Sequence, residues 1–170
     1  MTAAVLEGAA CPVVLDADGL NAVSGHIDRL DARAGTGRLT VLTPHDGEFA
    51  RLGGELSSGD RLGAARAFAA EHGCVLVLKG HRTVTAVPAG NALVNTTGTS
   101  ALAKGGSGDV LTGVIASLLA QGAPAPLAAA GGVWLHGRAG EIAAEKLTDY
   151  GVTPEDVAAA LPAAIGEVLA

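Results

Sequence analysis

Aromatic side chains are scarce in this sequence, which has two Phe, one Tyr and one Trp among its 170 residues. The apolar residues that make up 49% of the chain are mostly Ala, Val and Leu. Small aliphatic residues of this kind are typical of an α/β protein, and a chain of 170 residues is long enough to bury one core. We therefore predict a single α/β domain.

Clusters of Lys and Arg are also missing, and the net charge of −6 makes the chain acidic. Proteins that bind nucleic acid or an anionic membrane usually carry a basic patch, so both classes of partner are excluded. An acidic protein that binds phosphates needs local positive charge instead. Lysines close to glycines therefore become candidates for a phosphate site.

Cysteine is nearly absent, since the chain has only Cys11 and Cys74. Two isolated cysteines exclude a disulfide framework or a cysteine metal site, and we interpret both as small buried residues. No stretch is apolar for long enough to span a bilayer. The first ten residues lack the basic segment of a secretory signal and contain Glu7. We therefore expect a cytoplasmic protein.

Short apolar runs alternate with helical patterns along the chain. Buried strands are predicted at residues 12–16, 39–43 and 74–79. A hairpin is predicted for residues 83–87 and 92–95 around the turn at 88–91. The segment 16–21 is predicted to be a loop that leads into a short helix, and further helices are predicted at 48–52, 61–72, 110–121, 127–146 and from 154 onward. This alternation predicts a mostly parallel central sheet that is covered by helices on both faces and carries a small hairpin.

Ligands in such sheets bind beyond the carboxyl ends of the strands. Four features of the sequence fall at this edge, and they are the segments 16–21, 43–48, 79–83 and 103–113. Their convergence is stronger evidence for a site than any one of them.

The last of these segments contains Gly105, Gly106, Ser107 and Gly108, followed at once by Asp109. Glycines allow backbone N–H groups to turn toward one point, and a helix start adds unpaired N–H groups and a positive dipole end. The stretch therefore predicts an anion site that holds phosphate. A carboxylate at such a site suits a general base that takes a proton from a hydroxyl during phosphorylation.

Other interpretations of the glycine stretch can be checked on its residues. A P-loop needs a Lys directly after the glycines, and none follows; the dinucleotide fingerprint needs a glycine at position 111, which is Leu111. A glycine-rich turn that caps a helix, with Asp109 placed for the helix dipole, remains an open alternative.

Each of the other candidate residues also has a purely structural interpretation. His45 follows Pro44 at a helix start and could cap that helix. Lys79 at a strand end could be a solvated charge, and Asp16 could accept hydrogen bonds from its own turn. His136 lies in an apolar segment and is interpreted as structural rather than catalytic.

Five motifs in order resemble those of the ADP/ATP-dependent NAD(P)H-hydrate dehydratases, a family of the ribokinase-like superfamily. They are Val14 to Asn21, Thr43 to Glu48, Val77 to Gly80 with Thr83, Lys104 to Gly113, and Leu135 to Gly140. The resemblance implies a ribokinase-like fold and an enzyme that repairs NADH or NADPH hydrated at C6 of the nicotinamide ring. In that reaction ADP or ATP phosphorylates the hydroxyl, and loss of phosphate restores the double bond.

The resemblance also implies a role for each site residue. Asp109 is implied as the general base, with His45, Asp16 and Asn21 beside the hydrated nicotinamide. The nucleotide is implied to contact Lys79, Gly80, His81, Arg82 and Thr83, and its phosphates to contact Gly105, Gly106, Ser107 and Gly108. We further expect Mg²⁺ on the phosphates, with ligands that the sequence does not assign, and a homo-oligomer.

Members of this family carry a substantial N-terminal portion before the first of these motifs. We therefore expect residues 1–170 to form a single domain that lacks this portion. Two alternative functions stay open: a small-molecule kinase for a vitamin precursor, and an inactive nucleotide-binding fragment that needs a partner chain.

Overall fold

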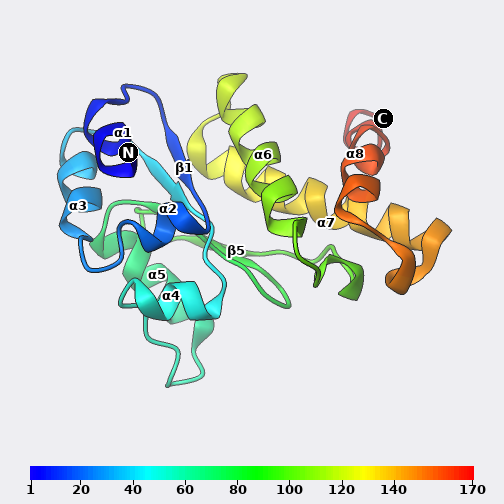
Figure 1. The fold of residues 1–170 in the computed structure, drawn as a ribbon, viewed down its shortest axis with the longest axis horizontal. Helices are drawn as coiled ribbons and strands as arrows, with labels where there is room; N and C mark the ends of the chain where they lie inside the picture. Colours follow the sequence, from blue (N-terminus) through cyan, green and yellow to red (C-terminus); the bar gives the residue numbers. More distant parts are fainter.

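A computed structural model describes all residues from Met1 to Ala170 and shows a five-stranded sheet with helices against both faces (Figure 1). The strands are β1 (Val13–Leu15), β2 (Thr40–Leu42), β3 (Val75–Leu78), β4 (Val84–Ala86) and β5 (Ala92–Val94), and they lie side by side in that order. β1, β2 and β3 are parallel, while β4 and β5 are the predicted hairpin, joined antiparallel to β3. The sheet is therefore parallel through its first three strands and antiparallel beyond them.

The helices form two groups, one on each face of the sheet (Figure 1). The first group is α1 (Thr2–Gly8), α2 (Asp18–Asn21), α3 (Asp28–Gly35), α4 (Asp46–Arg51) and α5 (Arg61–Glu71). The second group is α6 (Ser107–Ala120), α7 (Ala125–Gly151) and α8 (Pro154–Leu169), preceded by a 3₁₀ turn, η1 (Ser100–Leu102). The pattern in the sequence predicted α4 to α8 and a short helix at the segment where α2 lies, and it missed α1 and α3.

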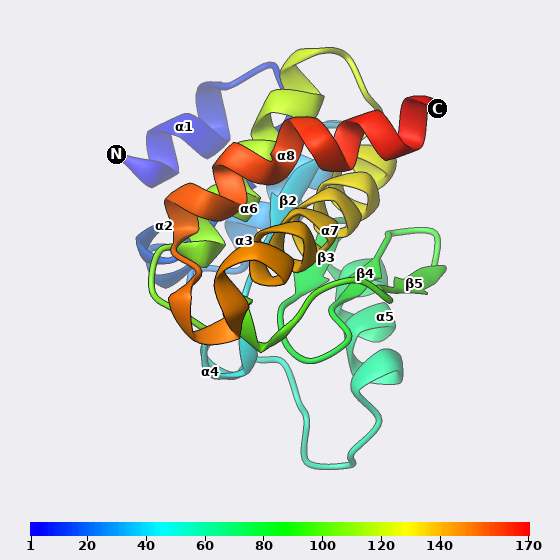
Figure 2. The same ribbon diagram turned by 90° about the vertical axis from the view of Figure 1, so that its right-hand side faces the viewer.

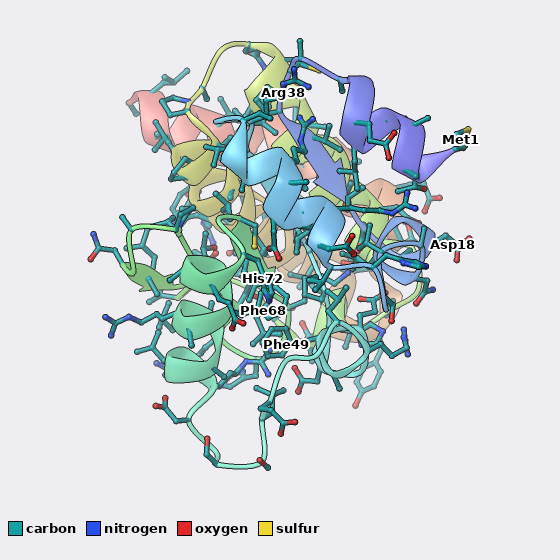
Figure 3. All side chains as sticks on the ribbon, turned by 90° about the vertical axis from the view of Figure 1, so that its left-hand side faces the viewer. Met1, Asp18, Arg38, Phe49, Phe68 and His72 are labelled. Carbon is teal, nitrogen blue, oxygen red and sulfur yellow. The ribbon has the colours of Figure 1, made fainter.

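Side chains of β3 alternate between two separate cores, as a strand buried on both faces requires. Leu76 and Leu78 belong to the core under α1 to α5, whereas Val75 and Val77 pack with Ile115 under α6 and α7. In the first core Phe49 and Phe68 pack edge to face, with ring centroids 5.2 Å apart, and His72 follows on the same side (Figure 3). Both phenylalanines are thus in this core, whereas Trp134 and Tyr150 belong to α7.

A buried arginine attaches α1 to the rest of the molecule. The Arg33 guanidinium is 3% exposed and donates hydrogen bonds to the carbonyls of Leu6, Ala9 and Cys11, at 2.9, 2.7 and 2.5 Å. These bonds satisfy the carbonyls at the end of α1 and fix the segment that leads into β1.

α8 crosses the outer surface of α7 and forms a third layer (Figure 2). It begins with the predicted cap: the Thr153 hydroxyl accepts from the Asp156 N–H, and the Asp156 carboxylate accepts from the Thr153 N–H. Arg138 of α7 donates two hydrogen bonds to Glu167 of α8, at 2.7 and 2.8 Å. None of the helices combines the length and the apolar character that crossing a membrane requires.

Candidate functional site

A cavity of about 1010 Å³ opens beyond the carboxyl ends of β2 and β3, where the sequence predicted a site. Its walls are the segment after β3, the polar segment that leads from β5 to α6, and one side of α6 and α7. The predicted site residues that line it are His45, Lys79, Gly80, His81, Arg82, Thr83, Ser107 and Gly108. The other predicted residues, Asp16, Asn21, Gly105, Gly106 and Asp109, do not line it.

Lys79 lies at the centre of a network that joins three strands to α6. Its ammonium donates a hydrogen bond to Asp16 Oδ1 at 2.8 Å and lies 3.9 Å from Glu48 Oε2. Asp16 Oδ2 accepts a hydrogen bond from the Thr112 hydroxyl at 2.9 Å. Lys79 is therefore not a solvated charge, and the side chain of Asp16 is bonded to partners distant in the sequence rather than to its own turn.

The electrostatics of Asp16 follow from these contacts. Burial raises the pKa of Asp16, but hydrogen bonding and attraction from Lys79, together with the hydroxyls of Thr112 and Thr43, outweigh burial and leave the pKa below its usual value. Asp16 is therefore an anion at neutral pH, and it forms an ion pair with Lys79.

His45 caps α4, as the structural interpretation of its sequence position predicted. Its Nδ1 accepts hydrogen bonds from the N–H groups of Gly47 and Glu48, and the Glu48 carboxylate accepts from the His45 N–H at 2.8 Å. Capping uses Nδ1 alone, so the rest of the ring can still line the cavity. The cap and a role in binding are therefore compatible.

The segment after β3 is held from outside the cavity by Arg61. Its guanidinium donates to the carbonyls of Leu78 and Lys79, at 3.2 and 2.6 Å, and pairs with Asp46 of α4. At the far end of the segment the Thr83 hydroxyl donates to the Gly80 carbonyl at 3.2 Å. These bonds fix the backbone between Lys79 and Thr83 as one wall of the cavity.

The glycine stretch turns directly into α6. Gly106 is the residue before the helix and has φ of 89°, a left-handed conformation that favours glycine. Ser107 and Gly108 form the first turn. The Ser107 N–H donates to the Lys104 carbonyl at 3.3 Å, whereas the Gly108 N–H has no partner within the helix. Because both residues line the cavity, one of its walls carries the Gly108 N–H group and the positive end of the α6 dipole.

Asp109 lies on a different side of α6 from the cavity. It is exposed and occupies the first turn of the helix, on the same face as Thr112, three residues on. Asn21 is also exposed, and its side-chain oxygen accepts a hydrogen bond from Arg51 at 3.1 Å. The two residues are therefore on the α2 side of the α6 terminus, with the cavity on the other.

His136 reaches the cavity from α7, where its Nε2 lies 3.3 Å from the Ser107 hydroxyl. Burial, together with the nearby positive charge of Lys79, lowers the pKa of His136 to about 4, although a hydrogen bond with the Ser107 backbone acts in the opposite direction. The imidazole is therefore neutral at physiological pH. Its contact with Ser107 connects α7 to the first turn of α6.

Sequence reasoning missed the opposite wall of the cavity. This wall is a polar segment of Asn95, Thr96, Thr97, Gly98, Thr99 and Ser100, which has no periodicity that marks it as a site. The Thr97 hydroxyl donates to the Trp134 carbonyl at 3.0 Å, and the Gly98 N–H donates to Glu141 at 2.7 Å. The density of hydroxyl side chains directly before the glycine stretch was the available signal.

Lys104, the lysine of the glycine stretch, binds the end of α7 rather than the cavity's anion site. Its ammonium donates to the carbonyls of Asp149, Tyr150 and Val152, at 2.9, 2.9 and 2.6 Å. These carbonyls lie at the carboxyl end of α7, where a cation is favourable. Lys104 therefore fixes the chain just before the glycines.

We expect Lys104→Met to lower the melting temperature by about 5 °C, because the loss of three hydrogen bonds from a charged group, two of them partly buried, costs about 2 kcal/mol. Thermal unfolding followed by circular dichroism would measure it. Lys146→Met is the matched control, since Lys146 is an exposed lysine of α7, the helix to whose carboxyl end Lys104 binds. Equal melting temperatures for the two variants would show that the three carbonyls do not depend on Lys104.

The chain offers no protein cluster for a metal ion, since no three or more His, Cys, Asp or Glu side chains are arranged to hold one. No carboxylate lines the cavity, and those of Asp16 and Glu48 both face the Lys79 ammonium. A Mg²⁺ ion here would depend on ligands from outside the chain, such as phosphate oxygens and water.

Known proteins are similar to this chain along nearly its whole length. A family profile described as NAD(P)H-hydrate dehydratase matches residues 3–163. A bifunctional NAD(P)H-hydrate repair enzyme of Gloeobacter violaceus is 49% identical over 153 residues, which cover 90% of this chain and 30% of that protein. An ADP-dependent (S)-NAD(P)H-hydrate dehydratase of Neisseria meningitidis is 47% identical over 137 residues, or 79% of this chain and 46% of that protein.

Solved structures agree with these relatives. The ADP/ATP-dependent NAD(P)H-hydrate dehydratase of Bacillus subtilis, co-crystallised with ATP and Mg²⁺, matches with a TM-score of 0.78 and 35% identity, over 92% of this chain and 55% of that chain. A ribokinase-like superfamily protein of Enterococcus faecalis matches with a TM-score of 0.70, 28% identity and coverage of 97% and 66%. The predicted ribokinase-like fold is confirmed, and the chain spans 30% to 46% of the two curated relatives named above.

Proposed function

Because this chain belongs to the NAD(P)H-hydrate dehydratase family, we propose that it acts in the nucleotide-dependent dehydration of NADH or NADPH hydrated at C6. The observation that supports this proposal most directly is the cavity itself. It brings together the Lys79 ammonium, the neutral His136 imidazole and the unpaired Gly108 N–H group of the α6 terminus, next to a wall of hydroxyl side chains. Such a site suits the phosphates and ribose of an adenine nucleotide.

The proposed reaction has two steps. The C6 hydroxyl oxygen attacks the terminal phosphorus of ADP or ATP, and the bond from that phosphorus to the bridging oxygen breaks, releasing AMP or ADP. The C6–O bond then breaks as the ring nitrogen donates electrons, a proton leaves the neighbouring ring carbon, and phosphate departs. Phosphorylation is needed because phosphate is a far better leaving group than hydroxide at neutral pH.

Each residue is assigned a role according to its position around the amino-terminal end of α6. The nucleotide enters from the cavity, with Lys79 to Thr83 along one wall, and the N–H groups of Gly105 to Gly108 hold the transferring phosphoryl group. The hydrated nicotinamide approaches from the α2 side, near Asn21 and Asp16, with His45 between the two ligands. Asp109 lies on that side and accepts the proton of the C6 hydroxyl.

Several wider features belong to the same proposal. Mg²⁺ accompanies the nucleotide phosphates, held by their oxygens and by water. We also propose a homo-oligomer in the cytoplasm that binds neither nucleic acid nor membranes. Residues 1–170 act as one domain.

The experiment that tests the function is a turnover assay on this chain with hydrated NADH, Mg²⁺ and either ADP or ATP. Recovery of the reduced-nicotinamide absorbance that depends on the nucleotide is the expected result. A stable phosphorylated product from a vitamin precursor, with no recovery of absorbance, would favour the kinase alternative. Recovery only after a partner chain is added would favour the inactive-fragment alternative.

A further inference from the structure

We propose that Asp16 is a positioning residue, which fixes the Lys79 ammonium beside Gly108 and thereby sets the positive charge of the anion site. This inference rests on the proposed function, and it gives Asp16 a role other than contact with the hydrated nicotinamide. It follows from how the two oxygens of Asp16 are used.

Both carboxylate oxygens of Asp16 are engaged inside the protein. Oδ1 accepts from Lys79 Nζ at 2.8 Å, and Oδ2 accepts from the Thr112 hydroxyl at 2.9 Å. The Asp16 side chain is only 10% exposed. Each oxygen thus has a protein donor, a lysine on one side and α6 on the other, and little of the side chain is left exposed to a ligand.

The position of the ammonium relative to α6 is the second part of the argument. A Cβ atom built on Gly108 would lie 3.2 Å from Lys79 Nζ and 3.5 Å from Asp16 Oδ2. The ion pair therefore lies directly against the first turn of α6. Lysine has three N–H donors, and Asp16 takes one of them. Glu48 Oε2, at 3.9 Å, is too distant to accept a hydrogen bond, so the other two donors remain available to a phosphate oxygen in the cavity.

The sign of the effect separates this role from the alternatives. If Asp16 were only a carboxylate near the phosphates, removal of its charge would relieve repulsion, and ADP would bind more tightly. If Asp16 contacts the hydrated nicotinamide instead, its loss would change the KM for that substrate and leave ADP affinity unchanged. A positioning role predicts that ADP binds more weakly, because Lys79 then leaves the α6 terminus.

The test is the Kd of ADP, measured by titration calorimetry in the presence of Mg²⁺. We expect Asp16→Asn to weaken binding about tenfold, which is the loss of one well-placed interaction with a charged group. Asp18→Asn is the matched control. Asp18 is an exposed carboxylate two residues after Asp16, so the substitution removes the same charge without breaking the ion pair (Figure 3). It should leave the Kd unchanged.

The decisive comparison is between Lys79→Met and the double variant that also carries Asp16→Asn. Since Asp16 acts through Lys79, adding Asp16→Asn to Lys79→Met should weaken ADP binding no further. A further tenfold loss in the double variant would overturn the proposal, as would unchanged or tighter binding in Asp16→Asn alone.

Thr112→Val tests the same point should Asp16→Asn fail to fold, because it removes only the hydroxyl that orients the carboxylate. We expect it to weaken ADP binding about threefold, and unchanged binding would count against the proposal. If the variants show the predicted order of ADP affinities but the wild-type chain does not turn over hydrated NADH, only the proposed function is rejected. A wild-type chain that binds no ADP would reject both.

Discussion

Asp109→Asn is expected to lower kcat for hydrated NADH about a thousandfold and to leave the Kd of ADP unchanged. The amide cannot accept a proton from the C6 hydroxyl, and loss of a general base typically costs a factor of this order. Binding of ADP should survive because Asp109 is exposed and lies outside the cavity that we assign to the nucleotide. The two quantities would be measured by the absorbance assay and by calorimetry.

The competing interpretation of Asp109 is a first-turn carboxylate that only stabilises α6. Glu155→Gln is the matched control, since Glu155 is an exposed carboxylate in the first turn of α8. Both variants should lose about 0.5 kcal/mol of stability through the helix dipole. A purely structural Asp109 predicts that the two variants keep the same kcat, which would remove Asp109 from the role of base.

The strands and the edge where they end could be predicted because their signals are local. The apolar run from Val75 to Leu78, bounded by Gly73 and Gly80, permits little other than a buried strand. Since the carboxyl ends of parallel strands meet at one edge, the residues after β2 and β3 were placed together before any contact was known. His45 and Lys79 confirm this: both line one cavity.

The missed elements depend on contacts between distant parts of the chain. α3 carries charged residues on most of its length, and its buried Arg33 is of a type that is rarely inside a protein. Only the carbonyls of Leu6, Ala9 and Cys11 explain why that guanidinium is buried, and they lie more than twenty residues away. No local pattern contains that information.

The side of α6 on which each residue lies was also beyond local reasoning. Ser107, Gly108 and Asp109 are adjacent in the sequence, yet only the first two line the cavity. A helix turns by about 100° per residue, so neighbours in the motif face different surroundings. The motif predicted which residues matter, and the packing of α6 against β1 and α7 decides which of them lines the cavity.

Gly108→Val is expected to weaken ADP binding about a hundredfold, the upper range for overpacking a filled site. The new Cβ would lie 3.2 Å from Lys79 Nζ, which is a tight contact, and 3.5 Å from Asp16 Oδ2, which is an ordinary one, so the two further carbons of valine would have to displace the ion pair. The flexible ends of Lys79 and Asp16 can move away, but that movement takes the ammonium from the α6 terminus. The branched side chain would also cover the N–H groups that the phosphate needs. Calorimetry with ADP measures the loss.

The same substitution at Gly113 separates crowding of the anion site from a general effect on α6. Gly113 is exposed in the same helix, and a Cβ there would meet no atom within 4 Å. Gly113→Val should therefore bind ADP as the wild type does, and neither variant should unfold, because glycine is itself a poor residue within a helix. Gly108→Ala, with one carbon instead of three, should fall between the two. Equal affinity for Gly108→Val and Gly113→Val would mean that the phosphate does not bind at the first turn of α6, and the nucleotide would then have to occupy another part of the cavity.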